Sequence, residues 1–332
     1  MTVLSIVVPC YNEQEALPET SRQLLALRGR LVAAGKIADD SRVVFVDDGS
    51  RDRTWAMIEE YAAAGLPVAG VKLSRNRGHQ NALLAGLFAA RGDAIVSVDA
   101  DLQDDIEAIE AMVDHYLLGC DVVYGVRSSR DTDTVFKRQT ARSFYWLMER
   151  LGAQTVRDHA DYRLLSRRAI EALREYGETN LYLRGIIPLL GFRSARVEYA
   201  RQARIAGESK YPLRRMLSLA LDAVTSFSVV PLRLISAIGI LVFVASLFVL
   251  GWTLWVALFT NRAVPGWASI TLPIYFLGGV QLLALGVIGE YLGKLYVEAK
   301  RRPRYFIERI VEGGPAAGEP RRREEAALRR ES

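Results

Sequence analysis

Two aspartates stand two residues apart near the middle of the chain, in the segment VDADLQD. Asp99 and Asp101 follow an apolar run, and Gln103 comes two residues later. Carboxylates two positions apart project to the same side of a strand, so both can reach one cation. Protein sites bind Mg²⁺ or Mn²⁺ through such hard oxygen donors together with substrate phosphates. We therefore expect these three residues to hold a divalent metal, although Asp-x-Asp alone is also typical of a solvated turn.

Two further polar segments, VVPCYNE and VDDGSRD, each follow a β-branched run. Acids and amides in such positions can bind a ribose or a base. Each segment taken alone also has the composition of an ordinary turn between a strand and a helix. The residues concerned are Pro9, Tyr11, Asn12, Glu13, Asp47 and Asp48.

The elements that carry these segments alternate over residues 1–125. The runs LSIVVP, RVVFVD, VAGVKL, AIVSVD and DVVYGV predict strands, and helical patterns separate them. This βαβ series predicts an α/β fold with a mostly parallel sheet. Open α/β sheets bind ligands at the carboxyl ends of their strands, so the polar segments are expected to meet at one edge. Further helices are predicted at VFKRQTARSFYWLMERLG and RAIEALREYG.

Two long uncharged runs follow, from Leu234 to Asn261 and from Ala263 to Gly289. A helix of about 20 apolar residues spans a bilayer, so we expect two transmembrane helices, with a pair of buried core helices as the alternative. Basic residues gather outside both runs, which places both termini in the cytoplasm. The segment just before the first run has one apolar helical face, as expected of a helix in the membrane interface.

Charge and cysteine content narrow the functional classes. The formal net charge is +5, from 43 basic and 38 acidic residues. The basic excess lies beside the uncharged runs, so anionic lipid is the expected partner and nucleic acid is not. The two cysteines fit neither a disulfide framework nor a metal site. We expect no signal peptide, because the first apolar run ends after seven residues in polar YNEQE.

Taken in this order, the three polar segments resemble the nucleotide-sugar half of family 2 glycosyltransferases with a GT-A fold. The segment LSRNRGHQNALLAG matches the Asn-x-Gly pattern of that family at Asn76 and Gly78. To about residue 300, the chain is similar to the polyprenyl-phosphate glycosyltransferases, which include bacterial bactoprenol glucosyltransferases and dolichol-phosphate mannose synthases. Where that group often reads Gly-Asp-Phe-Arg, this chain has Ala160-Asp161-Tyr162-Arg163. The matching segments are YGVRSSR, FKRQTARSFYWL, HADYRLLSRRA, ARQARIAGESKYPLRRML and TSFSVVPLR.

This resemblance implies an organisation and a reaction. A cytoplasmic GT-A domain (1–210) is followed by an interface helix (211–232), two transmembrane helices (233–298) and a charged cytoplasmic tail (299–332), in a bacterial inner membrane. The enzyme would transfer one sugar, glucose or N-acetylglucosamine, with inversion from a UDP-sugar to undecaprenyl phosphate, releasing UDP. A homo-oligomer such as a tetramer is also implied.

The resemblance also assigns roles to residues. Asp101 and Asp161 are expected to act in catalysis, with a structural Asp161–Arg163 salt bridge as the alternative. His79 and His159 are left outside catalysis, because a lone histidine beside a site is more often a packing residue. The nucleotide sugar is assigned to Pro9, Tyr11, Asn12, Glu13, Asp47, Asp48, Asn76, Asp99 and Gln103. The lipid phosphate is assigned to Arg127, Lys137, Arg138, Arg204 and Lys210, with contacts to membrane headgroups as the alternative.

Two other functions compete with this one. A processive polysaccharide synthase would share only the amino half, and its Gln-x-x-Arg-Trp motif is missing here. A non-catalytic membrane anchor could bind a nucleotide without turnover, but metal and acceptor motifs that are both intact argue against it.

Overall fold

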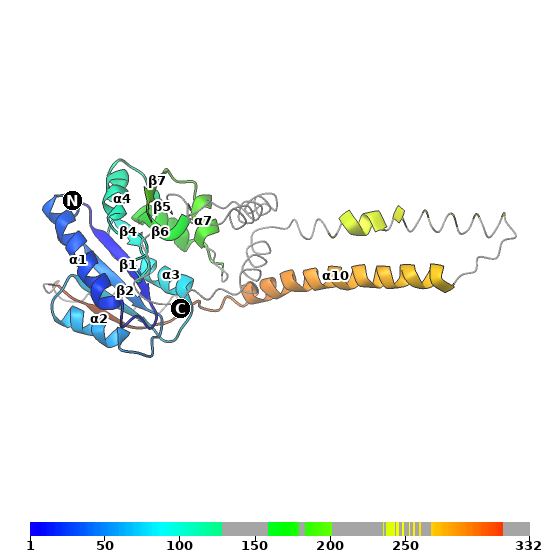
Figure 1. Ribbon diagram of the computed structural model, residues 1–332, viewed down its shortest axis with the longest axis horizontal. Helices are drawn as coiled ribbons and strands as arrows, with labels where there is room; N and C mark the ends of the chain where they lie inside the picture. The colour runs from blue at the N-terminus through cyan, green and yellow to red at the C-terminus, as the bar shows by residue number, and fades with distance from the viewer. Residues whose placement is uncertain are drawn as a thin grey trace. The chain divides into compact units, whose positions relative to one another are not determined.

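The computed structural model describes residues 1–127, 159–178, 183–200 and 267–314, with scattered positions between 235 and 259 (Figure 1). These residues fall into two compact units. The first holds the described positions up to residue 200 and from Arg301 onward, and the second holds those between 235 and 300. The helices predicted at 135–152 and 211–232 lie outside the described residues.

The first unit is built on a sheet with the strand order β7-β5-β6-β4-β1-β2-β3-β8. The four strands β3, β2, β1 and β4 run parallel, as the alternating pattern predicts. Beyond them the sheet is mixed, because β6 pairs antiparallel with both β4 and β5. The strands are β1 (Leu4–Cys10), β2 (Arg42–Asp47), β3 (Val68–Leu73), β4 (Ala94–Ser97), β5 (Val122–Arg127), β6 (His159–Ser166), β7 (Ser194–Tyr199) and β8 (Ile307–Glu312).

The insertion of β6 between β4 and β5 has a consequence for the site. In the pairing register Ser97, the last residue of β4, lies opposite Arg163. The Ser97 hydroxyl donates a hydrogen bond to the backbone carbonyl of Asp161 (2.5 Å). Residues 161–163 are therefore fixed next to the strand that leads into VDADLQD.

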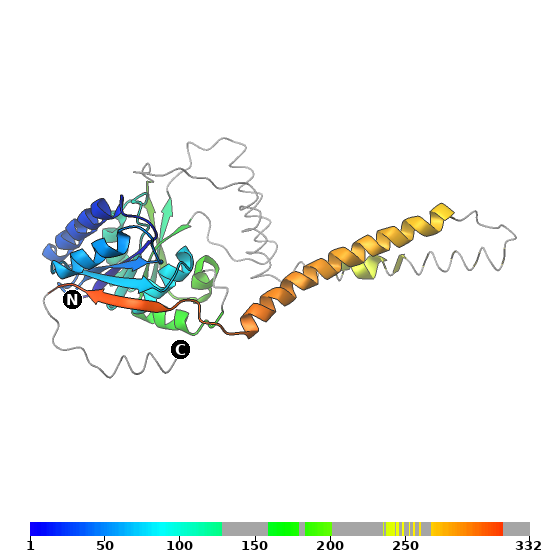
Figure 2. The ribbon, with the colours of Figure 1, turned by 90° about the horizontal axis from the view of Figure 1, so that it is seen from below.

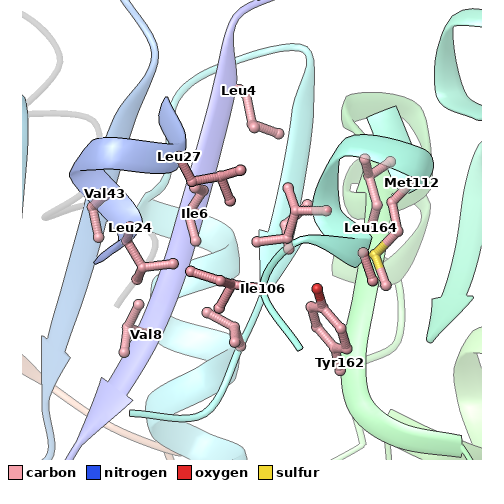
Figure 3. Packing of buried hydrophobic residues seen from close by; sticks show 14 of the residues in the cluster. Leu4, Ile6, Val8, Leu24, Leu27, Val43, Ile106, Met112, Tyr162 and Leu164 are labelled. Carbon is pink, nitrogen blue, oxygen red and sulfur yellow. The ribbon is translucent and has the colours of Figure 1, made fainter. Parts of the chain in front are cut away.

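Helices cover both faces of the sheet. Alternate residues of a strand face opposite sides, and Ile6 and Val8 of β1 pack in one cluster with Leu24 and Leu27 of α1 (Figure 3). On the other face α3 approaches β1 so closely that a Cβ on Gly86 would overlap a methyl group of Val7. The helices of this unit are α1 (Leu17–Ala33), α2 (Thr54–Ala63), α3 (His79–Ala89), α4 (Ala108–Leu117), α6 (Arg167–Arg174) and α7 (Leu183–Leu189).

The strand β8 was not foreseen, since its residues lie in the segment predicted to be a charged tail (299–332). It pairs antiparallel with β3 at the edge of the sheet (Figure 2). Ion pairs of Glu308 with Lys72 on β3 (3.1 Å) and of Glu312 with Arg42 on β2 (3.2 Å) join it to the rest of the sheet. Its charged sequence IERIVE obscured the strand pattern, because an edge strand keeps much of its surface in water and tolerates charges.

In the second unit, α10 (Trp267–Ala299) contains most of the second uncharged run. Among the residues that the structure describes, no helix combines the length and the apolar character that crossing a membrane requires. The prediction of two transmembrane helices is therefore not confirmed.

Candidate active site

The loops that follow β1 and β2 are joined by hydrogen bonds that involve two predicted site residues. The backbone N–H of Asn12 donates to the Ser50 hydroxyl (3.0 Å), and the Asn12 Oδ1 accepts from the N–H of Arg51 (2.9 Å). Asn12 has φ 56°, a left-handed conformation that asparagine tolerates better than most residues. The N–H of Glu13 donates to the Thr54 hydroxyl (2.9 Å). The polar segments VVPCYNE and VDDGSRD thus meet at one edge, as predicted.

The two aspartates at the end of β2 are buried and differ in their partners. Asp48 accepts hydrogen bonds from the N–H groups of Arg77 (2.6 Å) and Gly78 (2.8 Å), so it positions the loop that leads into α3. Asp47 Oδ1 accepts from the N–H of Ser50 (3.2 Å), while Oδ2 is buried with no hydrogen-bond partner among the described residues. Burial raises the pKa of both carboxyls. Asp47 is fully buried, so a contact of its orphaned oxygen with a ligand stays a prediction.

The remaining predicted nucleotide-binding residues lie around these loops. Tyr11 is 41% exposed and Asn76 is exposed, so both side chains are accessible to a ligand. Pro9 is instead buried within β1, opposite Val46. Gly49 has φ +68°, and a Cβ on it would lie 2.6 Å from the backbone nitrogen of Asn76. This close approach fixes the spacing between the β2 loop and the Asn76 loop.

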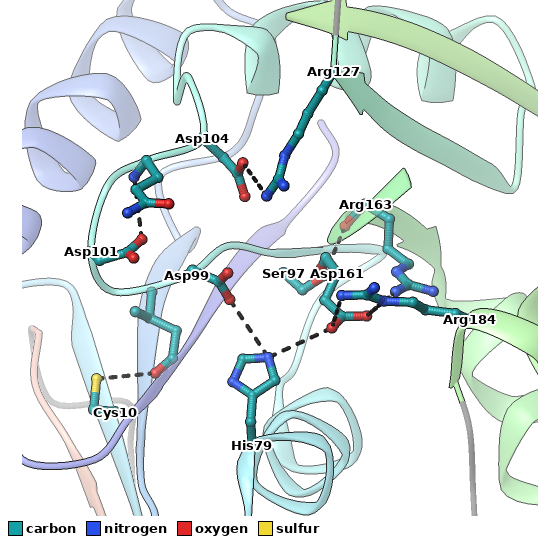
Figure 4. Close-up of polar contacts among 12 residues, drawn as sticks. Cys10, His79, Ser97, Asp99, Asp101, Asp104, Arg127, Asp161, Arg163 and Arg184 are labelled. Carbon is teal, nitrogen blue, oxygen red and sulfur yellow. Dashed lines mark hydrogen bonds and ion pairs between the residues drawn. The ribbon is translucent and has the colours of Figure 1, made fainter. Parts of the chain in front are cut away.

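The segment VDADLQD leaves the end of β4 and turns back sharply (Figure 4). Asp101 Oδ1 accepts a hydrogen bond from the N–H of Gln103 (3.3 Å). Between them Leu102 has φ 52°, which is uncommon for a bulky residue, and its side chain is buried. Backbone strain of this kind collects at ligand sites when surrounding structure enforces it. The apolar anchor of Leu102 therefore sets the direction of Asp101 and Gln103.

The carboxylates of this loop determine whether a metal ion can bind here. Within the described part of the chain, no three or more His, Cys, Asp or Glu residues form a group that could hold a metal ion. Asp99 and Asp101 supply a pair of carboxylates. Burial raises the pKa of Asp99 and His79 opposes this rise. The negative charges of Asp104, Asp161 and Asp101 raise the pKa of Asp99 further, and Asp104 has the largest effect of the three. Since a cation would relieve this crowding, the pair fits Mg²⁺ or Mn²⁺ when a substrate supplies the other oxygens.

Asp161 on β6 lies in a cluster of cations that sequence reasoning only partly anticipated. Its Oδ1 accepts from Nη2 of Arg163 and from Nε of Arg184 (3.1 Å), and its Oδ2 accepts from Nη2 of Arg184 (3.0 Å). Nε2 of His79 lies 3.8 Å from Asp161 Oδ2 and 3.5 Å from Asp99 Oδ1 (Figure 4). Burial alone would raise the pKa of Asp161, but the two guanidinium groups hold it well below its ordinary value. The Asp161–Arg163 salt bridge named as the alternative is therefore present.

Arg127 at the end of β5 belongs to a second network. It donates to Oδ1 of Asp104 (3.2 Å) and to the hydroxyl of Tyr199 (3.3 Å), and that hydroxyl donates to the same Asp104 oxygen (2.6 Å). The ring of Tyr162 packs edge-on against Tyr199, with centroids 5.1 Å apart. This network braces the loop of Asp99 and Asp104 against β5 and β7. A contact of Arg127 with a lipid phosphate stays a prediction.

Sequence reasoning missed Arg184 and Tyr199 and set His79 aside. Arg184 lies in a stretch without a recognised motif, so nothing in its neighbourhood marked it. His79 had a usable signal, because it is the first residue of a helix that starts at the same sheet edge. The predicted lipid-phosphate residues Lys137, Arg138, Arg204 and Lys210 lie outside the described residues.

Comparison with known proteins identifies the family of this site. Residues 5–174 match Glycosyl transferase family 2. The chain belongs to that family. The family 2 resemblance seen in its motifs is thereby confirmed, and the chain is a glycosyltransferase.

Relatives of this family 2 chain match it over most of its length. An uncharacterized glycosyltransferase of Bacillus subtilis, YkoT, is 50% identical over 308 residues, which cover 92% of this chain and 91% of the relative. A prophage bactoprenol glucosyl transferase homolog of Escherichia coli is 38% identical over 311 residues, covering 92% and 99%. Among solved structures, a Pyrobaculum calidifontis mannosyltransferase in complex with GDP-Man and Mn²⁺ has a TM-score of 0.43 at 18% identity, covering 86% and 87%.

Proposed function

We propose that this protein transfers one sugar, glucose or N-acetylglucosamine, from a UDP-sugar to undecaprenyl phosphate. The products are UDP and a polyprenyl monophosphate sugar with inverted anomeric configuration. The reaction would take place at the cytoplasmic face of a bacterial inner membrane. The segments at 211–232 and 233–298 would hold the family 2 domain at the lipid surface as an interface helix and two spans, in a homo-oligomer such as a tetramer.

One observation carries this proposal. The 38% identity to the relative named a bactoprenol glucosyl transferase homolog extends over 92% of this chain, well beyond the family 2 region at 5–174. A processive synthase would share the amino-terminal region alone, and the intact metal and acceptor motifs argue against a nucleotide-binding anchor. The similarity of the carboxyl-terminal part therefore favours a lipid phosphate as the acceptor.

The chemistry follows from the groups at the sheet edge. An oxygen of the lipid phosphate attacks the anomeric carbon of the donor sugar from the side opposite UDP, and a new C–O bond forms. The bond from that carbon to the diphosphate oxygen breaks, and its electron pair leaves with UDP. This in-line displacement inverts the anomeric centre. No covalent enzyme intermediate is needed.

Each group of side chains then has a part in the reaction. Tyr11, Asn76 and the orphaned oxygen of Asp47 bind the nucleotide, and the loops tied by Asn12 and Asp48 set their spacing. Asp99 and Asp101, with Gln103, would hold a Mg²⁺ or Mn²⁺ ion. Such an ion supplies Lewis-acid neutralisation of the diphosphate leaving group when it is bound.

Asp161 is proposed to orient the attacking lipid phosphate. That phosphate is already ionised near neutral pH, so it needs cations that dock it more than a base that deprotonates it. Arg127 and the basic residues Lys137, Arg138, Arg204 and Lys210 are proposed as the docking cations.

A radiolabelled UDP-sugar assay with undecaprenyl phosphate and Mg²⁺ or Mn²⁺ in detergent tests the proposal. We expect a labelled lipid product with UDP-glucose or UDP-N-acetylglucosamine. Asp161→Asn should abolish transfer and leave UDP binding by calorimetry unchanged. Asp39→Asn is the matched control, because Asp39 is 84% exposed.

Three results would contradict the proposal. Absence of a lipid-linked product with any common UDP-sugar would rule out the acceptor. A labelled polymer in place of a single-sugar lipid would indicate a processive synthase. UDP binding without any turnover would indicate a nucleotide-binding anchor.

A further inference from the structure

Arg184, on the short helix α7, belongs to none of the sequence motifs and contacts Asp161. We propose that Arg184 is a positioning residue for sugar transfer. Its guanidinium holds the carboxylate of Asp161 as a fixed anion, so that Asp161 acts through its charge and orientation and not as a proton acceptor. This inference rests on the proposed function.

The contact has the geometry of a two-point clamp. Nε of Arg184 lies 3.1 Å from Oδ1 and Nη2 lies 3.0 Å from Oδ2 of the same carboxylate. A guanidinium is planar and matches a carboxylate with two parallel hydrogen bonds, which fix the plane of the carboxylate as well as its distance. Lysine carries the same charge but cannot make this pair of bonds. The clamp therefore orients Asp161 in addition to neutralising it.

Arg163 does not replace this function. It lies two residues from Asp161 on β6 and reaches Oδ1 from the same strand. Arg184 comes from a different element, and it engages the second oxygen as well. Arg163 is 1% exposed, so it forms part of the interior, whereas the Arg184 side chain is 39% exposed and borders the site. The two arginines thus hold Asp161 from the interior and from the site.

The direction in which Asp161 faces links the clamp to the reaction. Oδ2 lies 3.8 Å from Nε2 of His79, and the same nitrogen lies 3.5 Å from Asp99 at the proposed metal pair. Besides orienting the lipid phosphate as proposed above, a fixed anion at this position would stabilise the positive charge that develops on the anomeric carbon as the bond to UDP breaks. An ionised lipid phosphate gives up no proton in its attack. The reaction therefore needs no proton acceptor at Asp161, but a fixed negative charge there would assist it.

The two roles for Asp161 predict opposite effects of removing Arg184. If Asp161 were a general base, losing the clamp would raise its basicity and kcat would rise or stay unchanged. If Asp161 is a fixed anion, the same change frees it to rotate and to be neutralised, and kcat falls. A rise in kcat would therefore identify a general base, whereas a fall is the result expected of a fixed anion.

The experiment compares Arg184→Gln and Arg184→Lys with the wild-type full chain in the lipid-transfer assay. We expect Arg184→Gln to lower kcat by about 10²-fold, the scale of a misplaced catalytic group. The donor KM and the affinity for UDP should stay within about threefold, and Arg184→Lys should recover part of the loss. Arg168→Gln is the matched control, since Arg168 pairs with Asp121 on the exposed side of α6 and should leave kcat unchanged.

Two outcomes of this assay would overturn the proposal. A kcat for Arg184→Gln at or above the wild-type value shows that the clamp does not serve catalysis. A parallel loss of UDP affinity and kcat shows that Arg184 binds the nucleotide or maintains the fold.

A stability measurement separates failure of this inference from failure of the proposed function. Arg184→Gln is made in the wild-type and in the Asp161→Asn backgrounds, and the melting temperatures are compared without any acceptor. A larger drop in the wild-type background supports the clamp even if no sugar reaches a polyprenyl phosphate. Equal drops in both backgrounds show that the two side chains are not coupled, and overturn it.

Discussion

Gly49 lies so close to the Asn76 loop that replacing it with alanine should lower the stability of the protein by a predictable amount. Gly49→Ala places a Cβ 2.6 Å from the backbone of both Arg75 and Asn76. Backbone atoms cannot move aside as a flexible side chain can, so the overlap should cost about 1–3 kcal/mol. The left-handed φ of +68° adds about 1–2 kcal/mol for any residue with a Cβ.

Gly35→Ala is the control that separates the cost of the overlap from the cost of the left-handed backbone. Gly35 follows α1 with almost the same φ, +69°, but nothing lies within 4 Å of its added Cβ. This control therefore carries the backbone strain without the overlap. The difference between the two variants should be about 1–3 kcal/mol, or a melting temperature roughly 2–12 °C lower for Gly49→Ala in a domain of this size.

The same pair of variants tests the link to nucleotide binding. Gly49→Ala can relieve its overlap by pushing the Asn76 loop away. If this displacement costs about 1.4 kcal/mol of binding free energy, UDP binds tenfold more weakly. We expect calorimetry to show UDP affinity lowered on the order of tenfold for Gly49→Ala and unchanged for Gly35→Ala. Equal melting temperatures and equal UDP affinities for the two variants would refute the reasoning.

EDTA should weaken UDP binding by the wild type, and Asp101→Asn should weaken it to the same extent without EDTA. If UDP binding by Asp101→Asn still depends on Mn²⁺, Asp101 is not a metal ligand. Arg163 and Arg184 lower the pKa of Asp161 in the folded protein despite its burial. The ionised carboxylate therefore stabilises the fold fully at pH values above the pKa of Asp in the unfolded chain, about 4, and this stabilisation is lost as the pH falls below it. The melting temperature difference between wild type and Asp161→Asn should thus stay constant from pH 7 to pH 5, and a decline within that range would contradict the assignment. Glu312→Lys turns the ion pair with Arg42 into a repulsion, so it should lower stability by about 1 kcal/mol and speed proteolysis of residues 301–314, whereas Glu312→Gln should have about half that effect.

Local patterns in the sequence predict much of the fold. The five predicted strands and the helix at RAIEALREYG are present because each has its own run of β-branched residues or its own helical period. The meeting of the polar segments at one edge follows from the parallel order of β1, β2 and β4. These features depend on nearby residues and on a general rule of open sheets, so sequence alone could supply them.

The features that were missed depend on contacts between distant residues. No local pattern says that β6 runs antiparallel between β4 and β5, or that β8 pairs with β3. Likewise Asp48 looked like a ligand residue, but its oxygens accept from the N–H groups of Arg77 and Gly78, about 30 residues away. Arg184 meets Asp161 only because α7 comes back to the amino-terminal end of β6.

The antiparallel pairing of β8 with β3 has a consequence during synthesis of the chain. The two strands are separated by more than 230 residues, with α10 between them. At about 5–20 residues per second, the outer edge of β3 waits roughly 10–50 s for its partner to leave the ribosome. Until then it presents unpaired N–H and C=O groups to any other strand nearby. The sheet of the first unit is therefore completed last at β3, although β3 is among the first strands to be synthesised.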